Sequence, residues 1–257
     1  MTAEENTVVV ERDETLEASY ANRSDPAHHP EQAKGIEGSA LCCSDGARTF
    51  SRLAYRAAKR AFDVVFSACV IAVAFMPGLV LCVLVALDTH GTPLYSQERV
   101  GMGGKTFRIL KFRTMVADSD DVEKYFTSEQ LEAWVRERKV DNDPRITKLG
   151  SLLRKFSLDE LPQFLNALIG QMSVIGPRAI SKDELNQHFT PNERKVLLSV
   201  PCGITGWWQV SERNDATFES GERQRLELEY VKNAGFSIDM HIFAKTFGAM
   251  FGEKTGR

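Results

Sequence analysis

The sequence predicts a membrane-associated α+β protein. It combines a re-entrant helix–break–helix hairpin with a small mixed domain, which holds a β-hairpin and amphipathic helices that reach the membrane interface. Two observations predict this class. Residues 64–87 carry no charge over 24 positions, enough apolar length for a membrane segment. In the residues that follow, apolar side chains recur at every second position in some segments, as in strands, and at helical spacing in others. We expect a tail over 1–50, a basic flank and membrane hairpin over 51–88, and a globular domain over 89–257.

The tail is acidic and lacks an apolar period. Residues 1–50 hold ten acidic and four basic side chains. Such a segment buries too little apolar surface to offset chain entropy, so it is predicted to be disordered. The whole chain has a net charge of −3 and no basic stretch interleaved with aromatics, so we expect no nucleic-acid partner. Its cysteines lack metal-ligand spacing and indicate a reducing compartment: Cys42, Cys43, Cys69, Cys82 and Cys202.

The apolar run is interrupted near its middle by Pro77 and Gly78. Divided there, it gives pieces of 13 and 10 residues, roughly 20 and 15 Å as helices, and neither crosses about 30 Å of hydrocarbon. Spanning helices tolerate proline kinks, so a single-pass helix remains an alternative. Basic residues flank the run on both sides, and positive flanks tend to stay cytoplasmic. They favour a hairpin that enters and leaves by one face: Arg52, Arg56, Lys59 and Arg60 before it, Arg99, Lys105, Arg108, Lys111 and Arg113 after it.

The globular domain begins with a predicted β-hairpin. Residues 92–115 alternate apolar and polar side chains around a glycine-rich turn. A helix is predicted from 127, where Thr127 and Gln130 have capping-box spacing. A second amphipathic helix is predicted over 148–156. Most apolar residues of these two helices are expected in the core: Leu131, Trp134, Val135, Leu149, Leu152, Leu153 and Phe156.

The last predicted helix, 236–251, has a broad aromatic-rich stripe. Core packing and a position in the membrane interface are equally compatible with such a stripe. Its members are Ile238, Ile242, Phe243, Phe247, Met250 and Phe251.

The stretch SLDELPQ, residues 157–163, places Asp159 beside Glu160. Ser157 and Glu160 match a capping box, which is the structural interpretation. The chemical interpretation is a nucleophile, because a helix N-terminus favours an ionised carboxylate and Asp159 is expected at one. Pro162 fits the first turn if Asp159 is the cap. Spacing alone leaves both interpretations open.

Basic residues suited to phosphate surround this stretch in the sequence. Lys111 and Arg113 share one face of a predicted strand, and Arg145 follows Asp143 beside a turn. An apolar strand ends in Gly176-Pro177-Arg178, a rigid turn that would aim one guanidinium. The guanidinium group can grip phosphate oxygens at two points. Taken alone, each of these residues would most often be an ordinary partner in a surface ion pair.

Four stretches occur in one order: KRAFDVV, ERVGMGGKTFRILKFRTM, DNDPRITKLGSLLRKFSLDELPQFLNALIGQMSVIGPR and PCGITGWWQVSERND. Together they closely resemble the bacterial sugar transferases, the monotopic phosphoglycosyl transferases that start exopolysaccharide, capsule and O-antigen repeat units. The resemblance covers about residues 55–251. It is closest to the short members of the family.

The resemblance implies an enzyme of the bacterial inner membrane, with its catalytic domain and N-terminus on the cytoplasmic face. It would transfer a phosphosugar, expected to be a hexose 1-phosphate, from a UDP-sugar to undecaprenyl phosphate and release UMP. Asp159 matches the family's nucleophile and metal ligand, Glu160 its dyad partner and Arg178 its phosphate-contacting arginine. Mg²⁺ is the implied cofactor. Pro77 matches the break of a re-entrant helix.

The sequence departs from the family pattern at two points. Ala179 stands where a proline usually follows Arg178, which loosens the turn. Glu212 stands where a glycine usually precedes the substrate-facing arginine, here Arg213. The resemblance favours galactose or glucose, with an N-acetylated sugar as an alternative, and is compatible with a homo-oligomer. Two other functions remain as alternatives: an inactive single-pass membrane protein that binds an assembly partner, and a transferase inactivated by these departures.

Overall fold

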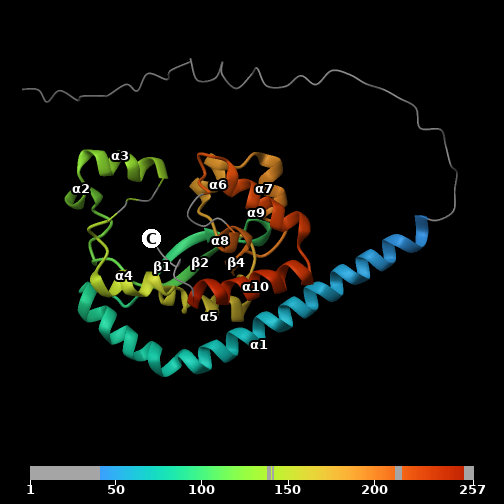
Figure 1. Ribbon diagram of the computed structural model, residues 1–257, viewed down its shortest axis with the longest axis horizontal. Coiled ribbons are helices and arrows are strands. Elements are labelled where there is room, and N and C mark those ends of the chain that lie inside the picture. The colour runs from blue at the N-terminus through green and yellow to red at the C-terminus, as the bar shows by residue number, and fades with distance from the viewer. Residues whose placement is uncertain (1–40, 138–139, 141, 212–215, 252–257) are drawn as a thin grey trace, which may run out of the picture. The chain divides into compact units, whose positions relative to one another are not determined.

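The computed structural model describes residues 41–137, 140, 142–211 and 216–251 of the 257-residue chain. Contacts divide the chain into residues 1–45 and residues 46–257, and the second unit is described below. It mixes helices with two small sheets (Figure 1), so the α+β class is confirmed. Helix α1 begins at Leu41, within the residues assigned to the predicted tail. Extending an existing helix costs little compared with starting one. Residues 1–40 lie outside the described part.

Helix α1, Leu41–Thr89, contains the whole apolar run and includes Pro77 without interruption. The two predicted helical arms therefore belong to one helix. Its ribbon changes direction in its cyan part (Figure 1). Proline bends a helix because it lacks an N–H and its ring crowds the preceding turn. Residues 52–89 are long and apolar enough to cross a membrane, by length and composition. Length and composition are shared by crossing and re-entrant helices.

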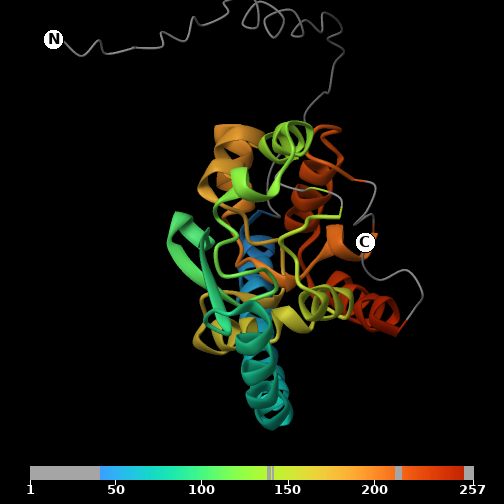
Figure 2. The same cartoon turned by 90° about the vertical axis from the view of Figure 1, so that its left-hand side faces the viewer.

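The basic flank of α1 is tied to the rest of the unit. The Arg60 guanidinium donates to the carbonyls of Ala167 (2.6 Å) and Leu168 (2.7 Å) near the end of helix α5, Gln163–Ile169. Phe66 contacts Phe164 of α5 and Phe243 of helix α10, Phe236–Phe251. Figure 2 also places α1 along the same side of the unit as these two helices.

The predicted β-hairpin is confirmed. Strands β1, Leu94–Val100, and β2, Thr106–Phe112, pair antiparallel, with Leu94 opposite Phe112. The glycine-rich turn contains the short 3-10 helix η1, Met102–Gly104. Gly103 and Gly104 there have φ of 69° and 79°, a conformation that glycine adopts without steric cost.

A second, parallel pair of strands brings distant segments together. Strand β3, Ser173–Ile175, pairs with β4, Gly203–Thr205. The pairing continues beyond β3 as a bridge between Arg178 and Gly203. A Cβ on Gly203 would lie 2.1 Å from the Gly176 nitrogen, so only glycine permits this approach.

Short helices surround these strands. The capping box predicted for α3 is confirmed by hydrogen bonds in both directions between Thr127 and Gln130, and the helix predicted at 148 is α4. Figure 1 labels the helices not yet named, apart from the 3-10 turns: α2 Val122–Tyr125, α3 Ser128–Glu137, α4 Lys148–Lys155, α6 Lys182–His188, α7 Pro191–Leu197, α8 Trp207–Ser211 and α9 Glu222–Asn233.

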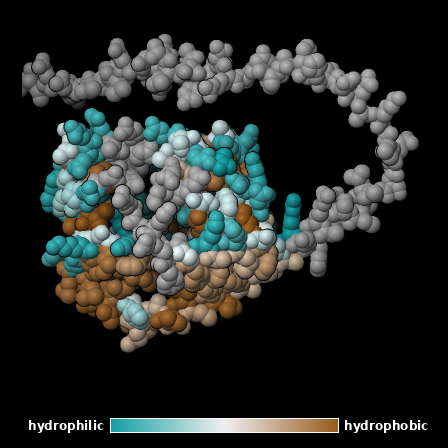
Figure 3. Space-filling view, viewed as in Figure 1, coloured by the Kyte–Doolittle hydropathy of each residue, from teal (hydrophilic) through white to brown (hydrophobic). Residues whose placement is uncertain are grey.

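Several apolar residues predicted to be buried lie at the surface instead. Leu153 of α4 is 1% exposed, but Leu152, Phe156 and Val135 are 51%, 43% and 63% exposed. Leu152 and Phe156 belong to elements that share an apolar face (brown in Figure 3). The stripe of α10 is divided between the core and the surface, with Ile242 fully buried and Phe247 42% exposed, and a position in the membrane interface remains a prediction. We call the large exposed apolar residues of α4, α5, α10 and the part of α1 from Val65 onward the apolar face: Val65, Val73, Phe75, Met76, Leu79, Val80, Val83, Leu84, Leu87, Leu152, Leu165, Ile169, Phe236 and Phe247, with Phe156 following α4.

Candidate active site

The segment with Asp159 and Glu160 is a tight turn. After α4, Ser157 takes a left-handed conformation with φ of 55°, and the 3-10 helix η2 covers Leu158–Glu160. The Ser157 side chain makes no capping hydrogen bond, so the predicted capping box is wrong. A capping residue is typically extended, and the left-handed Ser157 turns the chain instead.

Asp159 is buried, with 8% of its surface exposed. Burial raises the pKa of its carboxyl, and Glu160 raises it further, whereas Lys111 and Arg154 act in the opposite direction. Asp159 does lie at a helix start, in the first turn of η2, but the net effect of its surroundings is to raise its pKa. Asp159 precedes α5 by four residues and does not cap it, and desolvation is the largest influence on its pKa.

Lys111 connects the turn with the hairpin. Its Nζ donates to Glu160 Oε1 at 2.8 Å, and both side chains are about three-quarters buried. Arg154 of α4 is fixed near Asp159 by a 2.8 Å hydrogen bond from its Nε to Thr114 Oγ1. Two cations from separate elements therefore moderate the cost of ionising Asp159.

A pocket of about 280 Å³, including its open mouth, lies next to this turn. Glu160 lines it, and Asp159 stands immediately before Glu160 in η2. The pocket contains three cationic groups, one carboxylate and two neutral amides. Its lining comes from β1, β2, the η2–α5 segment, the turn after β3, β4 and α8: Arg99, Ile109, Lys111, Glu160, Gln163, Arg178, Ala179, Gly203, Ile204 and Gln209.

Arg178 enters the pocket from the turn after β3. Its backbone N–H donates to Glu227 Oε2 at 3.0 Å, which fixes the turn although Ala179 replaces a proline there. Its guanidinium lies 5.5 Å from the Trp208 ring centroid and forms no ion pair within the described part of the chain. It is thus available to an anion.

Two further arginines stand close to Arg178. Arg99 pairs with Glu184 at 2.7 Å, and burial lowers its pKa, with a further contribution from Arg178. Burial and then Arg178 lower the pKa of Arg223 to about 10, which leaves it cationic at neutral pH. Burial raises the pKa of the fully enclosed Glu227 to about 7, against the influence of Arg223 and Arg178. The region is rich in positive charge that an anionic ligand would stabilise.

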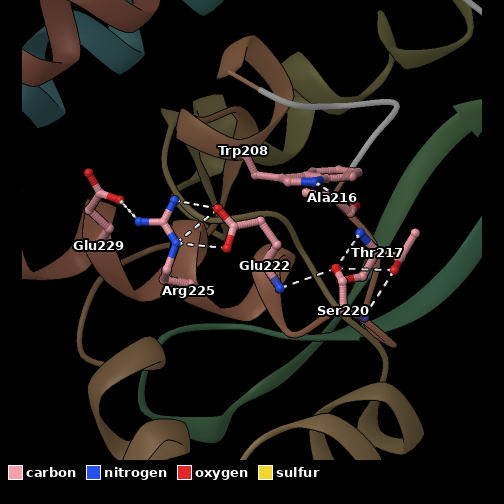
Figure 4. A network of polar contacts seen from close by, with 7 residues as sticks. All are labelled: Trp208, Ala216, Thr217, Ser220, Glu222, Arg225 and Glu229. Atoms are coloured by element: carbon pink, nitrogen blue, oxygen red, sulfur yellow. Dashed lines mark hydrogen bonds and ion pairs between the residues drawn. The ribbon is translucent and has the colours of Figure 1, made fainter.

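Trp208 is held in place from its other side. Its indole N–H donates to the carbonyl of Ala216 at 3.3 Å. Figure 4 shows the polar network beyond it, where Ser220 accepts from the backbone of Glu222 and Glu222 pairs with Arg225. This network closes the loop before α9, and α9 carries Arg223 and Glu227.

The structure does not bring all predicted phosphate ligands together. Lys111 and Arg178 line the pocket, but Arg113 donates to Thr92 and Arg145 forms a buried ion pair with Asp143 at 2.6 Å. For these last two, phosphate binding remains a prediction that the geometry does not support. Arg213 lies outside the described residues.

Four residues near the site were not predicted from the sequence to be site residues: Arg99, Arg154, Gln163 and Gln209. Arg154 and Gln163 stand within five residues of Asp159, so proximity in sequence was a usable signal. Arg99 and Gln209 offered none, because the folding of β1 and α8 onto the pocket depends on tertiary packing.

The donors at the turn suit a magnesium ion. Mg²⁺ is commonly held by one or two carboxylates together with substrate phosphates and water, and Asp159 and Glu160 supply adjacent carboxylates. Among the described residues, no group of three or more His, Cys, Asp or Glu side chains could hold a metal. With two carboxylates, further ligands would come from water and substrate oxygens.

Comparison with known proteins agrees with this arrangement of motifs. The family model described as bacterial sugar transferase matches residues 54–253. An exopolysaccharide production protein, ExoY, of Rhizobium meliloti is 41% identical over 197 residues, which cover 75% of this chain and 85% of that protein.

Two longer relatives are matched over part of their length. The undecaprenyl-phosphate galactose phosphotransferase of Salmonella typhimurium is 41% identical over 73% of this chain and 39% of its own. The UDP-glucose:undecaprenyl-phosphate glucose-1-phosphate transferase of Escherichia coli is 35% identical, again over 73% of this chain and 39% of its own. With a family model that covers most of its length and relatives at about 40% identity, this chain belongs to the bacterial sugar transferase family.

Proposed function

We propose that the protein transfers a hexose 1-phosphate from a UDP-sugar to undecaprenyl phosphate and releases UMP, through a phosphosugar bound covalently to Asp159. This would be the first membrane step in the synthesis of a polysaccharide repeat unit. The names of the Salmonella and Escherichia coli relatives support the two substrates. The observation that carries the proposal is a buried carboxylate, Asp159, beside a pocket lined by Arg99, Lys111 and Arg178.

In the first half-reaction an oxygen of the Asp159 carboxylate forms a bond to the sugar-bearing phosphorus. The bond from that phosphorus to the oxygen of the leaving UMP breaks, and UMP takes the electron pair. Asp159 must be ionised for this step, and Lys111 and Arg154 favour the ionised form. The Arg178 guanidinium stabilises charge on the phosphoryl oxygens.

In the second half-reaction an oxygen of undecaprenyl phosphate attacks the same phosphorus. The bond between phosphorus and Asp159 breaks, which restores the carboxylate and leaves the sugar on a lipid diphosphate. Glu160 either accepts the proton of the lipid phosphate or helps to hold the metal. Its 2.8 Å contact with Lys111 keeps it beside Asp159 in either role.

Asp159, with Glu160, would hold the Mg²⁺ ion together with substrate oxygens. Bound there, the ion supplies positive charge that offsets the charge of the phosphates.

The apolar face supports a position at the membrane surface. Fifteen large apolar residues of α1, α4, α5 and α10 and the end of α4 are exposed on it, far more than scattered surface residues would give. We place this face in the lipid, with both ends of the apolar run of α1 on the cytoplasmic side and with Pro77 and Gly78 within the membrane between them. The active-site turn follows α4 directly, so a lipid-bound phosphate would meet it at the interface.

The test is incubation of the purified protein, in lipid nanodiscs with Mg²⁺, with UDP-sugars labelled in the sugar. Undecaprenyl phosphate should yield a labelled lipid and one UMP per sugar transferred. Without the lipid acceptor, label should remain on the protein, and peptide mass analysis should find it on Asp159.

Two results would contradict the proposal in different ways. Release of UMP only in the presence of lipid, with no labelled protein on a rapid timescale, would indicate direct transfer. No transfer from any UDP-sugar would instead favour a membrane protein that binds an assembly partner.

A further inference from the structure

Two glutamine side chains form part of the pocket and have no role in the chemistry above. Gln163 is the first residue of α5, three residues after Glu160, and is 2% exposed. Gln209 lies in α8. Both line the same pocket as Lys111 and Arg178.

Each glutamine carries a buried polar atom without a hydrogen-bond partner among the described residues: Nε2 of Gln163 and Oε1 of Gln209. A buried polar atom left unsatisfied is costly and calls for an explanation. The Gln209 amide is oriented, since its Nε2 donates to the carbonyl of Ile204 at 3.4 Å. Gly206 leaves space for its oxygen, because a Cβ there would lie 2.9 Å from Oε1.

The chemistry of these two atoms differs from that of the cations around them. Arg99, Lys111 and Arg178 suit phosphate oxygens, which only accept hydrogen bonds. The glutamines offer one donor and one acceptor, and a hydroxyl group satisfies both because it donates once and accepts twice. In the proposed reaction the sugar is bonded through one oxygen to the phosphorus that Asp159 attacks, whereas the uracil lies beyond a second phosphate and a ribose. Sugar hydroxyls are therefore the neutral groups nearest to the reacting phosphorus.

We propose that Gln163 and Gln209 are specificity-determining residues that hydrogen-bond a hydroxyl of the transferred sugar. The inference rests on the proposed function and extends it to the choice of substrate. A site built to hydrogen-bond a hydroxyl discriminates strongly against an analogue without it, because its own buried groups are then left unpaired.

The experiment measures kcat/KM in nanodiscs for UDP-galactose, UDP-glucose and the singly deoxygenated forms of the sugar that the wild type prefers. It compares the wild type with Gln163→Met and Gln209→Met, which keep side-chain length and remove the amide. Gln224→Met is the matched control, since the Gln224 oxygen is also buried and unpartnered but lies outside the pocket.

We expect each pocket variant to lower kcat/KM for the parent sugar by about ten- to a hundredfold, with Gln224→Met close to the wild type. One deoxy analogue should react poorly with the wild type, and its deficit relative to the parent sugar should shrink in the pocket variants. Thermal unfolding identifies any variant that fails to fold. If a variant does not fold, the deoxygenated sugars still test the proposal with the wild type alone. Equal reactivity of all the deoxygenated sugars and the parent sugar would overturn it.

A second arm separates the sugar from the base. If the pocket variants keep their discrimination among deoxy sugars but lose that between UDP- and CDP-linked forms of one sugar, the amides contact the base and the inference is wrong. Should the wild type transfer the phosphosugar while neither glutamine variant changes kcat/KM, this inference fails and the proposed function stands. Should the wild type transfer none, both fail.

Discussion

In the proposed reaction Asp159 has to be ionised to attack phosphorus, yet its surroundings raise the pKa of its carboxyl. Burial raises its pKa above the ordinary 3.8, and Lys111 is the largest influence in the opposite direction. Keeping a buried carboxyl ionised although its pKa is raised lowers the stability of the folded state, and such destabilisation is typical of functional sites.

Asp159→Asn should abolish transfer, by about a thousandfold or more, and should also stabilise the protein at neutral pH. A raised folded pKa means that the folded state binds the proton more tightly than the unfolded state. The stability from this group is present below the unfolded pKa and is lost as pH rises through the folded pKa. Asparagine avoids that loss. Unfolding temperatures measured between pH 4 and 8 should show a gain at pH 7 that shrinks toward pH 4. A variant less stable than the wild type at pH 7 would contradict this account.

Lys111→Met should shift the acid limb of the activity profile to higher pH. Removing the cation withdraws support for ionised Asp159, so the carboxyl becomes protonated at a higher pH than in the wild type. The measurement is kcat/KM against pH. Lys105→Met, at an exposed position of the same hairpin, is the control and should leave the profile in place. A uniform loss at every pH would mean that Lys111 acts on the substrate rather than on the Asp159 pKa.

Among the helices and strands, the sequence predicts correctly those features that depend on neighbouring residues alone. The β-hairpin and the α3 capping box follow from alternation and from the Thr127–Gln130 spacing, and both form. The capping box at Ser157 has the same kind of spacing but does not form, because the chain turns sharply there. No local pattern predicts the partners of Arg145 or the position of Gln209 in the pocket, because both depend on which segments pack together.

The packing of α4 on the end of the hairpin depends on one glycine. A Cβ on Gly150 would lie 2.0 Å from the carbonyl oxygen of Thr114, and Thr114 also accepts from Arg154. Gly150→Ala should therefore destabilise the protein by roughly 3 kcal/mol and lower activity, as α4 moves with Arg154. Chemical denaturation in detergent measures this. Gly248→Ala, in α10 with open space around it, should be neutral or stabilising by up to about 1 kcal/mol. Equal effects of the two substitutions would contradict the proposed packing.

For the whole molecule, the apolar face and the distribution of charge both bear on how the protein is oriented in the membrane. The long helix is tied to the catalytic unit by hydrogen bonds from Arg60 and by Asp63, which accepts from Ser173 Oγ and the Val174 N–H at 2.9 Å each. These ties precede the apolar run. If the active site faces the cytoplasm, where UDP-sugars are made, the basic flank must face it too.

The conformation of α1 at Pro77 therefore determines on which side of the membrane the N-terminal tail lies. A spanning α1 would carry four basic residues across the membrane, Arg52, Arg56, Lys59 and Arg60, against the charge rule. A helix bent at Pro77 can return to the cytoplasmic side, provided that its loosened backbone groups are satisfied locally. A cysteine introduced as Glu5→Cys or Tyr20→Cys, with the five native cysteines replaced, should resist an impermeant reagent in intact cells and react after lysis. Pro77→Leu should straighten α1, expose part of the population to the reagent and lower activity in the same proportion. Ready labelling of the otherwise wild-type tail in intact cells would mean that α1 crosses the membrane once.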